Sequence, residues 1–276
     1  MFETVLIPLN LRESPQLVER VAAALAAYGA ESIILLHVQS SPQPSRRRAE
    51  LDRHAEELTQ AGYRCRVLQR SGSVAPTVVL TAAEEGCSLI AYPWRYKSWI
   101  QRSLVGSVTK DIVRLSDRPV FVYKPARVQS SRTEDDLNGP VVMYATDFRD
   151  TDSVVIPYLT ARLPDTGSLL LLHAGERAPD PAAEGRRLAR VNAALERLAT
   201  ECREPGHTVT TASVVGRPRT AVVRQAQRNR VDVLVIGKAD SERALATVLG
   251  STAESIAYNA RCSVLIIPRT ATPEEL

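Results

Sequence analysis

The chain has 276 residues, of which 44% are hydrophobic and 24% charged, as in ordinary soluble globular proteins, and this length allows one large domain or two of about 130 residues. No segment approaches the roughly 20 consecutive apolar residues of a membrane span. The net charge is only +4, and most arginines alternate with acids along helical segments, which indicates solvated helix faces and not a nucleic-acid-binding stripe.

Strand-like and helical segments alternate along the first half of the chain. Strands are expected at 4–9, at 32–37, before Gly72, at 88–92 and at 119–123. Helices are expected between them, most clearly near 74–86 and after Gly106. Around the start of this last helix and along it, apolar residues recur on one face: Val105, Val108, Ile112 and Val113.

The second half repeats this order, so the chain has a long internal period of about 140 residues. Strands are expected at 140–145, at 168–173, before Gly216, at 232–236 and at 263–267, with helices near 218–229 and after Gly250. From the third strand onward the two copies keep one register, 144 residues apart. The polar segment from Pro125 to Gly139 is expected to be a linker.

This alternation predicts right-handed crossovers and a parallel sheet covered on both faces. The near-continuous runs of Val, Ile and Leu in the strands agree with burial on both sides. The predicted fold class is therefore α/β, with two tandem doubly wound parallel-sheet domains of five strands each. We place the domains at 1–125 and 140–268, the linker at 126–139 and a tail at 269–276.

Two common nucleotide motifs are excluded by the glycine spacing. The closest pair, Gly167 and Gly175, is eight residues apart, so neither a Gly-x-Gly-x-x-Gly fingerprint nor a Walker A loop exists. The cysteines and histidines are scattered without metal-ligand spacing, so no metal site is expected and the thiols are interpreted as reduced. The N-terminus begins directly with a strand-like segment and has no leader, which predicts a cytoplasmic protein.

The chain resembles tandem members of the universal stress protein family, whose fold is of the adenine-nucleotide alpha-hydrolase type. The resemblance rests on 145–148 after the first strand of the second half, on 215–218, and on Gly-Ser pairs at Gly106 and Gly250. Members of the family that bind ATP carry Gly-x-x-Gly, nine residues and then Gly-Ser or Gly-Thr. Independently, such glycines let the backbone approach phosphates, and a helix N-terminus after them favours an anion.

In the second copy the resemblance implies a partly retained adenine-nucleotide site. It places Asp147 at the ribose and Ala174 at the adenine. The remaining cofactor-binding candidates surround the phosphates: Gly237, Lys238, Gly250, Ser251 and Thr252. Asp240 departs from the motif because it replaces the second glycine with a carboxylate, whose charge Lys238 and Arg243 would partly offset.

In the first copy the acid is replaced by Asn10, and the two early glycines by Pro93 and Tyr96. Proline removes an N–H group and fixes the local backbone, so this copy is expected to have lost ATP binding. A purely structural interpretation stays open for both copies, because serine commonly caps helices. The Trp94–Trp99 segment could stack on bases or hold a partner protein, but we favour packing in the abandoned pocket or between domains.

No nucleophile–base pair or metal constellation is visible, so no catalytic residue is assigned. We expect a cytoplasmic stress-response protein that binds an adenine nucleotide, AMP or ATP, in its second domain. A nucleotide-free interaction module with a protein partner is the alternative, and a slow ATPase is a third hypothesis. The resemblance further implies an intramolecular pseudo-dimer of the domains and a homodimer of chains, with no nucleic-acid or membrane partner.

Overall fold

The computed structural model describes residues 2–39, 45–94, 107–125, 139–162, 167–203, 208–238 and 251–271. These residues form two compact units. The first holds the described residues up to Tyr123, together with Thr270 and Ala271, and the second holds those from Lys124 to Arg269. Each unit is described by itself below.

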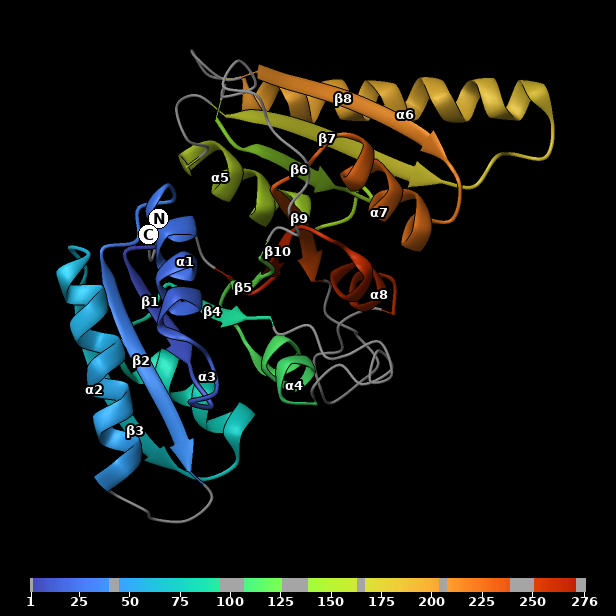
Figure 1. The fold of residues 1–276 in the computed structure, drawn as a ribbon. Coiled ribbons are helices and arrows are strands. Elements are labelled where there is room, and N and C mark those ends of the chain that lie inside the picture. The colour runs from blue at the N-terminus through green and yellow to red at the C-terminus, as the bar shows by residue number, and fades with distance from the viewer. Residues whose placement is uncertain are drawn as a thin grey trace. The chain divides into compact units, whose positions relative to one another are not determined.

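The first unit contains five parallel strands in the order β3-β2-β1-β4-β5 (Figure 1). The strands are β1 (Thr4–Pro8), β2 (Ser32–Gln39), β3 (Arg64–Ser71), β4 (Leu89–Pro93) and β5 (Val120–Tyr123). The helices are α1 (Pro15–Ala26), α2 (Ser45–Gln60), α3 (Val74–Glu84) and α4 (Ser107–Leu115). Helices α1 and α2 pack against each other, as do α3 and α4, on opposite faces of the sheet.

The second unit repeats this architecture in the order β10-β9-β6-β7-β8. The strands are β6 (Val141–Ala145), β7 (Ser168–Gly175), β8 (Thr208–Val215), β9 (Val233–Lys238) and β10 (Ser263–Pro268). The helices are α5 (Asp152–Arg162), α6 (Pro181–Cys202), α7 (Pro218–Arg228) and α8 (Ser251–Asn259). The prediction of two tandem α/β units with five parallel strands each is therefore confirmed.

The sequence forms these elements for local reasons that are easy to follow. In α1 the Ser14 side chain accepts a hydrogen bond from the Leu17 N–H at 3.3 Å, and Pro15 occupies the first helical position. The buried residues of α1 recur at helical spacing and face the sheet: Val18, Val21, Ala22 and Leu25. The central strands β1 and β6 are almost entirely buried, which explains their continuous apolar runs.

Glycine is needed at the same point of both units, just before α3 and α7. Gly72 has φ 138° and Gly216 has φ 146°, a region that other residues rarely adopt. The Gly72 N–H donates to the Gln39 carbonyl and the Gly216 N–H to the Gly175 carbonyl, both at 3.0 Å. These turns lie at the carboxyl edge of each sheet, where β3 and β8 end and the next helices begin. In the part of the chain that the structure describes, no helix has both the length and the apolar character to cross a bilayer.

Candidate functional site

The strand order of the second unit reverses between β6 and β9. These two strands pair directly in parallel, with Ala145 opposite Ile236 (Figure 1). The β6–α5 loop therefore emerges beside the end of β9, which carries Gly237 and Lys238. A reversal of this kind opens a crevice at the carboxyl ends of the strands, where open α/β sheets bind ligands.

A buried polar network shapes the β6–α5 loop. The Tyr144 hydroxyl donates a hydrogen bond to the Asp152 carboxylate at 2.5 Å, and the Thr146 hydroxyl donates to the same carboxylate at 2.8 Å. Burial raises the pKa of Asp152, while these two hydrogen bonds act in the opposite direction. The side chain of Asp152 thus joins the end of β6 to the start of α5.

The next part of the loop is held by Thr146 and His173. The Thr146 hydroxyl accepts the Phe148 N–H at 2.8 Å, and the Thr146 carbonyl accepts a hydrogen bond from His173 Nδ1 at 3.0 Å. The Phe148 backbone has φ 60°, and its ring stacks on His173 with the ring centroids 4.7 Å apart. Asp147, between Thr146 and Phe148, is consequently fixed at the tip of an ordered loop.

Asp147 itself faces solvent. Its side chain is 61% exposed and lies 3.2 Å from the Arg149 Nε atom. A carboxylate in this position has lone pairs available to a hydroxyl-bearing ligand, and the exposed ion pair with Arg149 is a weak competitor. The predicted adenine contact, Ala174, lies at the end of β7 and is buried. Asp147, Ala174, Gly237 and Lys238 all lie at the carboxyl edge of one sheet.

Gly237 has a packing reason to be glycine. A Cβ atom at this position would lie 2.7 Å from both the Cβ and the Oγ1 of Thr151, the residue before α5. The neighbouring Lys238 is only 1% exposed, so its ammonium is enclosed within the protein. The residues expected around the phosphates are only partly described: α8 begins at Ser251 and continues through Thr252, whereas Asp240, Arg243 and Gly250 lie outside the described residues.

The corresponding loop of the first unit is closed by its own side chains. The Glu13 carboxylate is 6% exposed and accepts the N–H groups of Asn10 at 3.1 Å and Arg12 at 3.2 Å. Leu11 has φ 64°, close to the value of Phe148. Two N–H groups of this loop are thus already bonded to Glu13. In the second unit Asp150 stands three residues after Asp147, as Glu13 does after Asn10, and it points away, 79% exposed and 3.6 Å from Arg269.

Strand β4 of the first unit ends in the buried Pro93, and the Trp94 N–H donates to the Tyr123 carbonyl at 2.7 Å. Trp94 is half-buried, and the rest of the segment to Trp99 lies outside the described residues.

His37 repeats the role of His173, because its Nδ1 donates to the Leu9 carbonyl at 2.9 Å. A carbonyl can only accept, so Nδ1 carries the proton and Nε2 accepts from Arg47 at 3.3 Å.

The sequence reasoning missed the Tyr144–Asp152–Thr146 network. Its only signal is the polar character of these residues on an otherwise apolar strand and at a helix start. The first unit has Ile7, Leu9 and Pro15 at the matching positions, 137 residues earlier. A comparison of the two copies would therefore have shown that this polar cluster belongs to the second unit.

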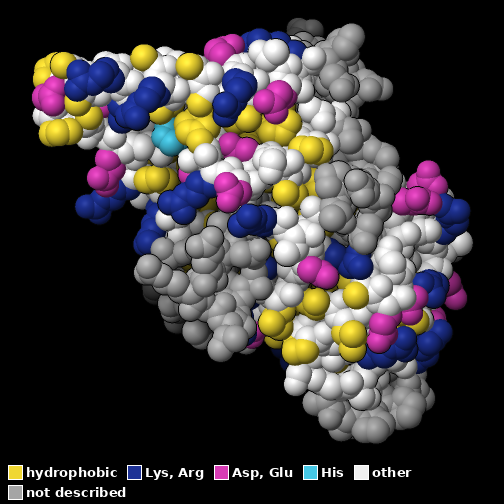
Figure 2. Space-filling model, turned by 180° about the vertical axis from the view of Figure 1, so that it is seen from behind, with side chains coloured by type: hydrophobic (Ala, Val, Ile, Leu, Met, Phe, Trp, Pro, Cys, Tyr) yellow, Lys and Arg dark blue, Asp and Glu magenta, His cyan; other side chains and the backbone are white. Residues whose placement is uncertain are grey.

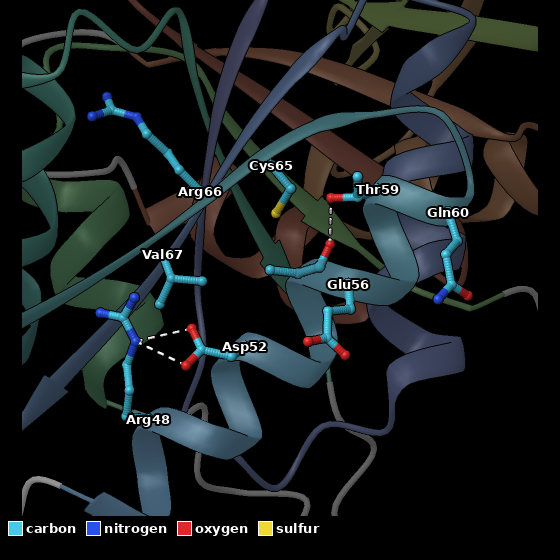
Figure 3. A pocket seen from close by; sticks show the side chains of 9 residues that line it. Arg48, Asp52, Glu56, Thr59, Gln60, Cys65, Arg66 and Val67 are labelled. Carbon is cyan, nitrogen blue, oxygen red and sulfur yellow. Dashed lines mark hydrogen bonds and ion pairs between the residues drawn. The ribbon is translucent and has the colours of Figure 1, made fainter.

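A groove of about 630 Å³ lies elsewhere, between α2 and β3 of the first unit (Figure 3). Several of its polar side chains already have partners: Arg48 Nε donates to both Asp52 oxygens at 2.9 and 3.1 Å, and Thr59 Oγ1 donates to the Ala55 carbonyl at 2.8 Å. Burial raises the pKa of the Cys65 thiol in this groove to about 12, so it stays protonated and unreactive. The strand residues that line the groove, Cys65, Arg66 and Val67, come from the start of β3, and the loops after β1 and β4 contribute none of its lining.

No cluster of three or more potential metal ligands occurs among the described residues. Burial raises the pKa of the other three thiols as well, to about 11 for Cys87 and Cys262 and about 12 for Cys202. The chemistry that the second unit offers is therefore hydrogen bonding to a polar ligand by an exposed carboxylate, on a loop whose shape the buried network fixes.

Comparison with known proteins agrees with the fold. A model of the universal stress protein family matches residues 1–124 and 142–268. A universal stress protein of Methanocaldococcus jannaschii is 21% identical over 155 residues, which cover 45% of this chain and 96% of that protein. The crystal structure of a functionally unknown protein from Pseudomonas aeruginosa aligns at TM-score 0.73 and 18% identity, over 99% of this chain and 96% of that one. A universal stress protein from Archaeoglobus fulgidus aligns at TM-score 0.71 and 20% identity, over 98% and 99%.

Proposed function

The chain belongs to the universal stress protein family, and from this premise we propose that it is a cytoplasmic stress-response regulator whose second unit binds an adenine nucleotide, AMP or ATP. One observation supports this most: the Asp147 loop is fixed by a buried polar network at the strand reversal of the second unit. The protein acts by binding, not as an enzyme.

In the proposed complex the ribose hydroxyls donate to the exposed Asp147 carboxylate, and the adenine lies against the end of β7 at Ala174. The phosphates lie at the N-terminus of α8, near Gly250, Ser251 and Thr252, where backbone N–H groups favour an anion. Gly237 and Lys238 form the wall from β9. The first unit has a structural role and binds no nucleotide, because Glu13 accepts the N–H groups of its loop and Pro93 replaces the glycine.

A second candidate function is a nucleotide-free interaction module that recruits a protein partner. The packing of Gly237 against Thr151 favours it, since this glycine is explained without any ligand. Under this hypothesis the Asp147–Arg149 pair is a solvated surface feature. A slow ATPase is a third candidate, and it requires the binding that the first candidate describes.

The small molecules carried by the protein separate these functions. Protein purified gently from cells should release an adenine nucleotide on denaturation, identified by mass spectrometry in an amount near one per chain. The Asp147→Ala variant, purified in parallel, is the control and should release much less. Release of no nucleotide, together with no binding of added AMP or ATP in calorimetry, would support the interaction module. Phosphate release from added ATP would identify the ATPase.

We also propose that two chains associate into a homodimer, with a tandem pair of units contributed by each chain. Sedimentation velocity over a range of concentrations tests this independently of the ligand. A single species of monomer mass at every concentration would refute it.

A further inference from the structure

The outer face of α3 is unusual for a solvent-facing helix. Leu80 is 59% exposed, and Pro76 and Ala83 are exposed on the same face at helical spacing. Leu115, the last residue of α4, is 40% exposed. Helices α3 and α4 pack together and both run from the carboxyl edge of the sheet to its opposite edge. We call Pro76, Leu80, Ala83 and Leu115 the α3 patch.

The space-filling view agrees with this grouping. Figure 2 shows apolar side chains gathered on the first unit where α3 and α4 lie, with charged side chains at their margin. Single exposed apolar residues are normal on a protein surface, whereas several of them on one face of packed helices indicate an interaction site.

The second unit shows that the fold does not require this face to be apolar. In the register of 144 residues, Leu80 corresponds to Arg224, Ala83 to Gln227 and Leu115 to Asn259. Pro76 corresponds to Thr220. The same helices, in the same architecture, thus carry a polar outer surface on the second unit, and the α3 patch is specific to the first.

The charges at the two ends of α3 fit a second copy of the same helix. Its N-cap residue, Ser73, makes no side-chain hydrogen bond to the first turn, which therefore keeps its partial positive charge. Its last residue, Glu84, is exposed. In an antiparallel pair that crosses at Leu80, Glu84 lies four residues, or about 6 Å, beyond the crossing and faces the first turn of the other helix.

Two copies of helix α7 would not form the same antiparallel pair. Arg228 stands at the position that matches Glu84, and Arg217 is the N-cap residue. An antiparallel pair of α7 helices would bring positive side chains to the positive helix ends, which is unfavourable. Both the apolar centre and the charged ends therefore favour self-association at α3 alone.

From these observations we infer that the α3 patch is a self-association surface, which pairs with the α3 patch of a second copy about a two-fold axis near Leu80. The contact is isologous, so each copy contributes the same residues. A stable interface buries about 800 Å² per partner, which these four side chains alone do not reach, so the association is expected in the micromolar range. This inference rests on the self-association proposed above and identifies the face that mediates it.

The test is sedimentation velocity on the full chain, with unfolding followed by circular dichroism. Leu80→Arg, which installs the residue of the second unit, should weaken association about tenfold or more. The matched control is Val215→Arg, which places the same charge on an exposed apolar residue of the second unit (51% exposed) and should leave association unchanged.

A second pair of variants separates association from folding. Ser73→Asp supplies a better N-cap, so the melting temperature should stay equal or rise. Association should nevertheless weaken, because the carboxylate introduced at position 73 repels Glu84 of the second copy. Adding Glu84→Lys to Ser73→Asp should restore association. A natural chain that stays monomeric would refute both the homodimer and this surface. Association that is insensitive to Leu80→Arg would refute this surface alone.

Discussion

Gly237 and Thr151 approach so closely that a single added carbon atom at Gly237 would lie 2.7 Å from the Thr151 side chain. The two residues are far apart in the chain, at the end of β9 and just before α5. Their contact locks the β6–α5 loop against the strand beside it, and this has a direct test.

Gly237→Ala should destabilise the second unit by about 1–3 kcal/mol, because the packed site has no room for a methyl group. Thr151→Gly removes a buried side chain that hydrogen-bonds to Tyr144, so it should by itself cost about 1–3 kcal/mol. In the double variant the alanine should fit, so much of its cost should disappear. Denaturant unfolding of the four proteins gives the coupling energy. Additive losses would mean that the clash is relieved in another way.

The two units should differ in nucleotide binding. Asp147→Ala should weaken binding of AMP or ATP by about 1–2 kcal/mol, because the hydrogen bonds to the ribose are lost. Asn10→Ala is the matched change in the first unit and should have no measurable effect, since the Asn10 Oδ1 atom already accepts the Arg12 N–H, at 2.9 Å. Calorimetry on both variants measures this. Equal losses in the two would place binding in both units.

The buried network should make stability depend on Tyr144. Tyr144→Phe leaves the Asp152 carboxylate without one donor and should cost about 1–3 kcal/mol at pH 7.

The same network should make stability depend on pH through Asp152. Burial raises the folded-state pKa of Asp152 above 3.8, so the folded state holds this proton at a pH where the unfolded state has released it. The stabilisation that the raised pKa of Asp152 gives the folded state is therefore present below pH 3.8 and lost as the pH rises through the folded pKa. Asp152→Asn should abolish this slope in unfolding free energy measured from about pH 3 to about pH 7.

His54 should make the first unit sensitive to acid. It is 1% exposed on the apolar face of α2, and neither ring nitrogen has a hydrogen-bond partner among the described residues. Burial, assisted by Arg53, lowers its pKa below 6.5, against the opposing charges of Glu57, Glu50 and Glu13. The unfolded state thus takes up the proton first.

The free energy of unfolding of the first unit should therefore be unaffected by His54 above pH 6.5. It should decrease as the pH falls from 6.5 towards the folded pKa of His54, by at most about 1.4 kcal/mol per pH unit. His54→Leu places an apolar residue between Leu51 and Leu58 and should remove this dependence while keeping the unit at least as stable at pH 7. Denaturant unfolding at about pH 7.5 and about pH 5.5 measures both effects. An unchanged slope in the variant would assign the acid sensitivity to another group.

Asp240 should set the preference for phosphate-chain length. A carboxylate about 5 Å from a phosphate charge costs roughly 3 kcal/mol at an effective dielectric near 20, and water and Lys238 reduce this to about 1 kcal/mol per charge. AMP should therefore bind at least as well as ATP. Asp240→Gly should tighten ATP about tenfold and leave adenosine nearly unchanged. Equal gains for ATP and adenosine would mean that Asp240 does not face the phosphates.

Most of the fold could be predicted because its signals are local and repeated. The continuous apolar run expected at 263–267 is the strand Ser263–Pro268, and the helix expected near 74–86 is Val74–Glu84. Such runs are typical of strands buried on both faces. The second copy repeats each element, so each assignment could be checked against its counterpart. The element ends shifted by one or two residues, where backbone hydrogen bonds and not side-chain pattern decide the boundary.

The site was less predictable because its contacts are tertiary. Asp147 could be selected by its position after a strand. Glu13 turns back onto the Asn10 N–H, which depends on loop geometry. Asp150 points towards Arg269, which depends on a residue far away in the chain. The contact that requires Gly237 lies on a threonine 86 residues earlier in the chain. No pattern in a single sequence reports such contacts.

The two units share a hydrogen bond from a histidine Nδ1 to a backbone carbonyl, at matched places in the fold. His37 and His173 make the same bond to the end of the neighbouring strand, while the loops beside them have diverged into a closed and an open form. Each copy is thus an internal reference for the other. A feature common to both copies can be attributed to the fold. A difference between matched positions shows that the fold does not require that residue. A substitution that installs in one copy the residue found at the matched position of the other copy therefore uses a residue that already occurs in the same fold.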